Sequence, residues 1–332
     1  MIERRNESKD EGSRMSKSKT KQKKQSKYNF TQKIPNSIKT PLRYPGGKSR
    51  ATKFLKDYLP RHFKEYREPF LGGGSMAIYV TKKYPDANVW VNDLYYNLYN
   101  FWKQLRDQGP RLYEELVRIR TPIDFNSKLS RKNKIPRADW DPHIIKSIAA
   151  NKELFIKAKE EINTTDNLFT SAVYFYILNK CSFSGLGENS SFSEMASDQN
   201  FNLRGINKLP EYSKLIQNWK ITNLDYKEVM NASPNNNCFV FLDPPYDIKD
   251  NLYGDGGDMH KGFNHVKFHK DVVECEHNWM ITYNSNEVLR KRFANFNLTE
   301  WDLTYTMRSV GEYAENQKGR KELLVTNYEV NK

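Results

Sequence analysis

The residues with the clearest chemical potential follow a run of five apolar residues at 238–242. Such a run is typical of a strand buried on both faces, and this one ends at Asp243-Pro244-Pro245-Tyr246. The two prolines fix their own φ angles and hold the preceding residue extended, so the turn should be stiff. Asp243 and the carbonyl of Pro244 could accept both hydrogens of an –NH2 group, while Tyr246 could lie flat against a ring.

This arrangement suits one kind of chemistry, in which the exocyclic amine of a nucleobase is the nucleophile. Such an amine is a poor nucleophile because its lone pair is delocalised into the ring. Two acceptors holding its hydrogens would favour the pyramidal form and direct the lone pair at an electrophile, which stabilises the transition state. We therefore predict that the catalytic residues are Asp243, Pro244, Pro245 and Tyr246. The alternative is an ordinary junction between strand and loop with a capping Asp.

A glycine-rich junction gives the second signal. Residues 66–76 predict a short strand that runs into three glycines at 72–74, followed by a helix from Ser75 to Tyr84. Glycines there let the backbone approach a ligand at a helix N-terminus. Their spacing is not G-x-G-x-x-G, so a dinucleotide fold matches poorly. A second predicted strand ends in Asp93, a place where an acid commonly holds ribose hydroxyls. Together these features predict an adenosine pocket; singly, they would be a loop and a helix cap.

The segment Thr40–Ser49 contains Tyr44-Pro45-Gly46-Gly47-Lys48. Two glycines followed by Lys and Ser resemble half of a phosphate loop. The upstream glycine and the preceding strand of a Walker motif are missing, which argues against nucleotide hydrolysis. The pattern favours a tight turn that holds a small ligand beside Tyr44 and Lys48.

The elements that must position these residues form two groups. Strand patterns occur at 87–93, 219–226, 238–246, 278–284, 298–305 and 322–328, and the last two predict a hairpin-like pair. Helical patterns at 110–119, 142–160 and 166–179 occupy the middle of the chain, and Ser182–Asn202 is predicted to be a long irregular loop. We predict an α/β fold with a catalytic domain at 39–104 and 219–332, interrupted by an inserted, mainly helical region at 105–218.

The charge of the chain favours a polyanionic partner. The 332 residues carry a net charge of +14, and residues 1–33, with 11 Lys/Arg and 4 Asp/Glu, contribute half of it. Residues 1–38 are almost free of apolar side chains and are predicted to be a disordered basic tail. Such a tail is either a non-specific nucleic-acid arm or a solvated leader.

Three further patterns bound the class of protein. The three cysteines are far apart and form no C-x-x-C pair, which fits a reducing cytoplasm. No apolar run is long enough to span a bilayer, and we predict no membrane association. His265 and His269 stand four residues apart on a predicted helix. No third ligand is evident, and we expect no metal site.

These motifs, in this order, resemble the Dam-type (alpha-class) DNA adenine-N6 methyltransferases from about Pro41 to Tyr328. The similar segments are 41–48, an N-terminal motif that touches the cofactor; 68–75, the cofactor loop; 92–93, the ribose-binding acid; 225–226, at the family's Asp-Phe; 243–246, the catalytic motif; and 320–327, the C-terminal strand. Six segments in the family's order, with an insertion of about a hundred residues between the halves, carry the resemblance.

The resemblance implies a seven-stranded Rossmann-like methyltransferase sheet and an inserted target-recognition region. It implies S-adenosylmethionine as the methyl donor and double-stranded DNA as the partner, and it leaves room for a cognate restriction endonuclease. The target adenine would flip out of the duplex and stack on Tyr246. By resemblance, the cofactor-binding residues are Tyr44, Pro45, Gly46, Lys48, Phe70, Gly72, Gly73, Asp93, Asp225, Tyr226 and Asp243.

One departure concerns the DNA target. Where the family's Dam members carry an Arg, this chain has Gly187 and Glu188, which argues against GATC as the recognised sequence. The motif D-P-P-Y serves any exocyclic amine, so cytosine-N4 methylation and RNA methylation stay alternatives. A third alternative is a DNA-binding relative without catalysis. The motif order favours adenine in DNA.

Overall fold

The computed structural model describes residues 39–44, 47–124, 136–183, 185, 188, 190–232, 237–246, 262–302 and 321–330. The predicted disordered tail at 1–38 lies outside the described residues. The same is true of Pro45, Gly46 and Gly187. No described helix is long and apolar enough to cross a membrane. The cysteines are all buried and free.

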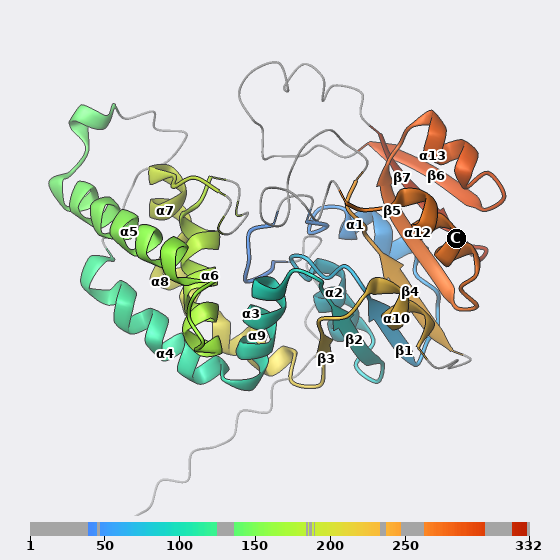
Figure 1. Cartoon of the computed structure of the whole chain (residues 1–332), viewed down its shortest axis with the longest axis horizontal. Coiled ribbons are helices and arrows are strands. Elements are labelled where there is room, and N and C mark those ends of the chain that lie inside the picture. The colour runs from blue at the N-terminus through green and yellow to red at the C-terminus, as the bar shows by residue number, and fades with distance from the viewer. Residues whose placement is uncertain are drawn as a thin grey trace, which may run out of the picture. The chain divides into compact units, whose positions relative to one another are not determined.

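Seven strands form one sheet, in the order β3-β2-β1-β4-β5-β7-β6 (Figure 1). Neighbours among the first five in this order are parallel, whereas β7 runs antiparallel to both β5 and β6. The predicted seven-stranded sheet and the predicted pairing of the last two strands are therefore confirmed. The strands are β1 Glu65–Glu68, β2 Asn88–Asn92, β3 Lys220–Thr222, β4 Cys238–Leu242, β5 Asn278–Asn284, β6 Asn297–Asp302 and β7 Lys321–Thr326.

Strand β4 is central, which explains its uninterrupted apolar sequence. It pairs in parallel with β1 on one side and β5 on the other, and each of its five residues is buried. The chain runs outward from β1 to β2 and β3, and then returns to β4 on the other side of β1. The order of the strands thus reverses between β1 and β4, and ligands of open α/β sheets bind at the carboxyl ends of the strands beside such a point.

Six described α-helices accompany the sheet in the segments before residue 108 and after residue 225. They are α1 Thr52–Leu55, α2 Ser75–Lys83, α3 Tyr96–Asp107, α10 Tyr226–Asn231, α12 His265–Val273 and α13 Glu287–Arg292. Helices α10, α12 and α13 contribute Met230, Phe268 and Leu289 to one core cluster with Val240 and Ile281 of the sheet. All five are fully buried, and each such side chain contributes about 1.5–3 kcal/mol of hydrophobic stabilisation. This packing fixes the strand ends that carry the predicted site.

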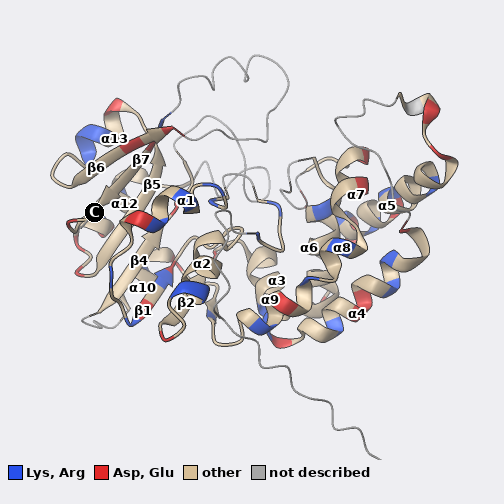
Figure 2. Cartoon of the chain, turned by 180° about the vertical axis from the view of Figure 1, so that it is seen from behind, with Lys and Arg blue, Asp and Glu red and all other residues tan. Residues whose placement is uncertain are grey.

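The described elements between α3 and β3 are mainly α-helices separated by non-helical segments. The helices are α4 Gly109–Arg120, α5 Pro142–Glu161, α6 Leu168–Cys181, α7 Glu194–Asn200, α8 Leu203–Ile206 and α9 Leu209–Leu215. Helix α6 is apolar on all sides and packs against both α3 and α5. Figure 2 shows charged residues along α4 and α5. The sequence of α6, in contrast, contains a single charged residue, Lys180.

The prediction of an irregular loop over Ser182–Asn202 was wrong in part, because α7 lies within it. The side chain of Ser193 caps this helix by accepting a hydrogen bond from the backbone N–H of Ala196 at 3.2 Å. The seven residues of α7 are mostly polar and show no helical apolar period, so the cap was the only strong local signal.

Candidate active site

The carboxylate of Asp243 lies directly beyond the carboxyl end of β4. Its Oδ1 atom is 2.8 Å from Nζ of Lys48 and accepts a 2.8 Å hydrogen bond from Oγ1 of Thr282 on β5. The parallel pairing of β4 with β5 brings Thr282 beside the acid. Asp243 keeps about a fifth of its side chain exposed, whereas the Lys48 side chain is 3% exposed. The acid is thus held in place on one side and open to a ligand on the other.

Lys48 links the predicted catalytic acid to the predicted stacking residue. Its Nζ atom donates a 2.8 Å hydrogen bond to the hydroxyl of Tyr246 and lies 4.7 Å from the centre of that ring. The Tyr246 hydroxyl in turn donates to Oε2 of Glu322 at 2.6 Å. Asp243, Lys48, Tyr246 and Glu322 therefore form one connected chain of charge-assisted hydrogen bonds, which are stronger than neutral ones.

Glu322 was missing from the site residues predicted from the sequence. It belongs to β7 and is 4% exposed. The signal that could have identified it is an acid inside the mostly apolar stretch Glu322–Val325, because a buried carboxylate needs a partner. Its antiparallel register, with Glu322 opposite Asn284 of β5, brings it to the end of the sheet that holds Asp243.

A second acid missed by the sequence analysis lies beneath the site on β1. Glu68 is buried and accepts a 2.7 Å hydrogen bond from the hydroxyl of Tyr66. Burial raises the pKa of Glu68 well above its ordinary value, the hydrogen bond from Tyr66 acts against this, and the negative charge of Asp243 raises the pKa further. Burial and the nearby charge of Asp243 thus both favour the protonated form of Glu68.

The glycine loop brings the next group of predicted residues together. Gly72 has a φ of +50°, and its N–H donates to Oδ2 of Asp93 at 2.8 Å. A Cβ at Gly72 would lie 2.8 Å from Cε1 of Tyr44, and one at Gly73 would lie 3.0 Å from Cβ of Tyr44. The loop needs glycine at these two positions because the Tyr44 ring covers it. The predicted approach of this backbone to a ligand stays a prediction, and the close neighbour in the structure is Tyr44.

Asp93 follows β2, as predicted, and is anchored by backbone donors. Besides Gly72, the N–H of Tyr95 donates to its Oδ1 at 3.0 Å. Burial raises the pKa of Asp93 to about 6, although both backbone hydrogen bonds lower it. A carboxylate has about four acceptor positions, so Asp93 can still accept hydrogen bonds from hydroxyl groups of a ligand.

Two predicted aromatic residues face each other beside this loop. The rings of Phe70 and Tyr226 are stacked, with centroids 5.5 Å apart. The Tyr226 hydroxyl donates to Oδ2 of Asp271 at 2.7 Å. Burial acts to raise the pKa of Asp271, but hydrogen bonds from Lys227, Tyr226 and Lys267 lower it to about 2. The ring of Tyr226 is thereby fixed by a carboxylate that stays ionised.

Asp225 has a local structural role. Its exposed side chain caps α10 by accepting a 2.8 Å hydrogen bond from the N–H of Lys227, and Glu228 completes a capping box. Its predicted contact with the cofactor stays a prediction.

The two histidines considered as a metal pair have other neighbours. Nδ1 of His265 lies 3.0 Å from the Tyr283 hydroxyl, and the ring of His269 packs edge-on against Phe293. Within the described ranges, no group of three or more His, Cys, Asp or Glu residues could hold a metal ion.

Asp243, Gly72 and Asp93 follow the carboxyl ends of the neighbouring parallel strands β4, β1 and β2. Comparison with known proteins gives a consistent result. The chain is 27% identical over 224 residues to Type II methyltransferase M.MjaIII of Methanocaldococcus jannaschii, which covers 63% of this chain and 69% of that protein. It is 25% identical over 323 residues to Modification methylase StsI of Streptococcus sanguinis, covering 88% of this chain and 43% of that protein.

A third relative, Type II methyltransferase M.CviBI of Paramecium bursaria Chlorella virus NC1A, is 19% identical over 296 residues, which is 88% of this chain and its own whole length. The family model of the D12 class N6 adenine-specific DNA methyltransferases matches residues 44–307, a range that includes the predicted catalytic motif at 243–246. Most of the chain is matched, and the protein therefore belongs to the D12 class N6 adenine-specific DNA methyltransferase family.

Proposed function

We propose that this protein transfers a methyl group from S-adenosylmethionine to the N6 amine of an adenine that has left double-stranded DNA, with Asp243 as the residue that holds the amine. The observation that carries this proposal is the position of Asp243 and Tyr246. Both lie immediately past a buried central strand, and the acid lies within 2.8 Å of a buried cation. An adenine inside a duplex could not reach such a position, so extrusion of the base follows.

The residues around the glycine loop fit the proposed cofactor. Its positively charged sulfonium supplies an electrophilic methyl group when the cofactor is bound. Asp93 has acceptor capacity for the two ribose hydroxyls, and the stacked rings of Phe70 and Tyr226 offer an apolar surface for an adenine ring. Tyr44 covers Gly72 and Gly73. Together with the neighbouring Gly72 and Gly73, these residues would hold the cofactor.

The protein's part in the reaction is to orient and to accept hydrogen bonds. Asp243 and the carbonyl of Pro244 would each accept one hydrogen of the adenine amine, which directs its lone pair away from the ring. Because Oδ1 of Asp243 already accepts from Lys48 and Thr282, Oδ2 is the atom available for the amine or for the proton it loses. Pro245 keeps the turn stiff, and Tyr246 would stack on the base.

We propose that the helical region at 105–218 recognises the DNA sequence. Glu188, which stands where the Dam members have an Arg, is engaged inside the protein. Its carboxylate accepts hydrogen bonds from the Tyr95 hydroxyl and from Nδ2 of Asn97. This engagement supports a target other than GATC. The names of the relatives, two type II methyltransferases and a modification methylase, support a partner restriction endonuclease that cuts the same sequence.

Nucleoside mass spectrometry tests the proposal. Purified protein would be incubated with S-adenosylmethionine and unmethylated duplex DNA, and the DNA digested to nucleosides. We expect N6-methyldeoxyadenosine, and we expect at least about a hundredfold less of it with Asp243→Asn. Asp86→Asn, a matched change of an exposed acid before β2, should retain activity. N4-methyldeoxycytidine would overturn the base assignment, and the absence of any methylated base on DNA or RNA would overturn the proposed catalysis.

A further inference from the structure

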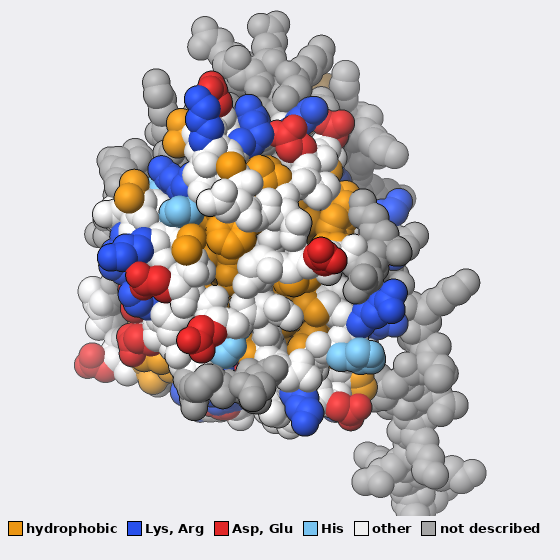
Figure 3. All heavy atoms as spheres, turned by 90° about the vertical axis from the view of Figure 1, so that its right-hand side faces the viewer, with side chains coloured by type: hydrophobic (Ala, Val, Ile, Leu, Met, Phe, Trp, Pro, Cys, Tyr) orange, Lys and Arg blue, Asp and Glu red, His pale blue; other side chains and the backbone are white. Residues whose placement is uncertain are grey.

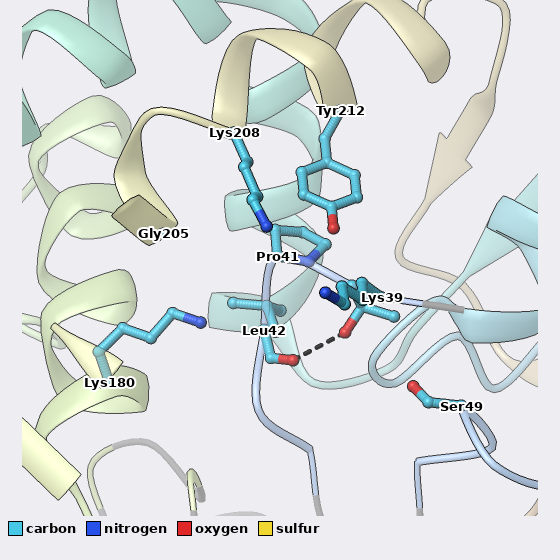
Figure 4. A pocket seen from close by; sticks show the side chains of 9 residues that line it. Lys39, Pro41, Leu42, Ser49, Lys180, Gly205, Lys208 and Tyr212 are labelled. Atoms are coloured by element: carbon cyan, nitrogen blue, oxygen red, sulfur yellow. Dashed lines mark hydrogen bonds between the residues drawn. The ribbon is translucent and has the colours of Figure 1, made fainter. Parts of the chain in front are cut away.

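A pocket of about 370 Å³ lies between the segment that precedes the active site and the helical region (Figure 4). One wall is formed by residues 39–42 and Ser49, and the other comes from α6, α8 and the segment around the start of α9. The lining residues are Lys39, Thr40, Pro41, Leu42, Ser49, Lys180, Gly205, Lys208 and Tyr212. None of the predicted catalytic or cofactor-binding residues lines it.

The charge of this pocket has a single sign. Lys39, Lys180 and Lys208 line it, and none of its nine described lining residues is acidic. In Figure 4 the side chains of Lys180 and Lys208 extend toward Leu42 and Pro41 from two different helical segments. Lys39 is exposed and Lys208 half-buried, so the pocket is open to solvent. By contrast, Figure 3 shows positive and negative side chains interspersed on the face beside α12 and α13.

Lys180 is the unusual member of the group. It is 8% exposed, in the last turn of the apolar helix α6. Among the described residues, its ammonium group has no hydrogen-bond or ion-pair partner, and its nearest aromatic neighbour is the ring of Tyr176 at 5.1 Å. Burying an ammonium group without a partner is costly. Burial, and secondarily the positive charge of Arg43, lower the pKa of Lys180 to about 7. An anion in the pocket would remove this cost.

Hydrogen bonds hold the two walls in position. Nδ2 of Asn179 on α6 donates to the carbonyl of Arg43 at 2.6 Å, and Oδ1 of Asn179 accepts from the N–H of Arg43 at 2.9 Å. The Arg43 guanidinium donates to the carbonyl of Ser182 at 2.7 Å. Within the wall formed by residues 39–42, Oγ1 of Thr40 donates to the carbonyl of Leu42 at 2.7 Å. The lysines are therefore presented by a preformed site.

We propose that this pocket binds one backbone phosphate of the DNA, with Lys180 and Lys208 as its principal ligands. The hydroxyl of Tyr212 adds a neutral hydrogen-bond donor, which suits the several oxygens of a phosphate group. The site would fix the position of the duplex without reading its sequence, as phosphate contacts do. It also joins the helical region to the segment that leads into Tyr44 and Lys48, so DNA bound there would contact both parts of the enzyme. The inference rests on DNA being the substrate.

Salt-dependent DNA binding tests the proposal. The affinity of the full chain for a short duplex would be measured by fluorescence anisotropy between about 50 and 200 mM KCl, a range over which phosphate contacts are strongly weakened. Lys180→Met and Lys208→Gln should each make the negative slope of log K against log salt shallower by about 0.9. This corresponds to roughly eightfold weaker binding at 0.1 M salt if affinity at 1 M is unchanged. Thermal unfolding would check each variant, and Lys180→Met should not lower Tm because it replaces an unpaired buried cation by an apolar chain.

The matched control is Lys83→Gln. Lys83 is exposed in the last turn of α2, which leads into the start of β2 and so lies at the opposite edge of the sheet from the site. It should leave the slope unchanged. Unchanged slopes in both pocket variants would overturn the proposal. Calorimetry with inorganic phosphate distinguishes the source of the anion. If Lys180→Met abolished phosphate binding but left the salt dependence of DNA binding unchanged, the pocket would be assigned to a free anion instead. Failure of methyl transfer with intact DNA binding would overturn only the proposed catalysis.

Discussion

The contact between Lys48 and Asp243 should give a measurable coupling between the two residues. Asp243→Asn keeps the shape of the side chain but removes its charge, which leaves the 3% exposed Lys48 side chain beside a neutral amide. Removing one partner of a fully buried ion pair costs about 3–5 kcal/mol. Here the cost should be smaller, because Asp243 is 20% exposed and Lys48 keeps its hydrogen bond to Tyr246. We expect a loss of roughly 1–3 kcal/mol.

Lys48→Met should also destabilise the protein, by about 1–2 kcal/mol, because Asp243 loses its cation but keeps Thr282 and some hydration. The double variant carries neither charge. Its loss should therefore be smaller than the sum of the single losses by about 1–2 kcal/mol. Denaturant unfolding of the four proteins without DNA would measure this double-mutant cycle. Additive losses, within about 0.5 kcal/mol, would refute a direct interaction between the two charges.

The same four proteins separate the stability of the site from its chemistry. Asp243→Asn should lower turnover by about 10²–10³-fold, as losses of charge-stabilising groups in active sites do. The double variant should regain part of the stability but no activity, because the amine still lacks its carboxylate acceptor. Turnover would be followed as methyl groups incorporated into duplex DNA at saturating methyl donor. Recovery of activity in the double variant would show that Lys48 blocks the site rather than supporting it.

Three further changes test the surrounding residues. Asp93→Asn should weaken methyl-donor binding. In the wild type, donor affinity should fall as the pH drops below about 6, because the pKa of Asp93 is raised to about 6 and its protonated form loses acceptor capacity. Calorimetry across pH would show a flat affinity profile if Asp93 were outside the pocket. The raised pKa also means that ionising Asp93 costs stability as pH rises from about 4 to 6, so Asp93→Asn should flatten the wild type's stability change over that interval. Glu322→Gln should lower turnover up to roughly thirtyfold with unchanged donor affinity. The reason is that the hydrogen bond from Tyr246 would no longer have a charged acceptor, a loss of about 1–2 kcal/mol. Turnover equal to the wild type would remove Glu322 from the site. Gly72→Ala should destabilise the protein by about 1–2 kcal/mol, because Gly72 has a positive φ and lies against the Tyr44 ring. The control Gly205→Ala, at a position without either constraint, should not destabilise it. Equal melting temperatures of the two variants would contradict this reason.

Much of the fold was predictable because the local and the global signals agree. The run at 238–242 is apolar since β4 is flanked by strands on both sides, and the acid at its end marks the edge where the site forms. The same holds for Asp93 after β2. In each case a backbone pattern and a polar residue of defined position suffice, with no knowledge of the tertiary contacts.

The contacts of Glu322 and Lys180 could not be predicted in this way. Glu322 lies 76 residues from Tyr246, and their hydrogen bond depends on the register between β5 and β7. Lys180 lies in the last turn of the apolar helix α6, and the tertiary fold brings it into one pocket with residues 39–42. A sequence shows that a charged residue interrupts an apolar pattern, but it does not show which distant side chain or ligand compensates for it.

The charges of the site explain why a lysine is placed against the catalytic acid. Nζ of Lys48 lies 2.8 Å from Oδ1 of Asp243, and the Tyr246 hydroxyl links Lys48 to Glu322, so one buried cation lies between two acids. In the proposed reaction a positive charge moves from the methyl donor to the amine that Asp243 holds. A fixed negative charge at the place where positive charge arrives lowers the barrier. Lys48 prevents the two acids from repelling each other while leaving that negative charge on the exposed side of Asp243, where the base must enter.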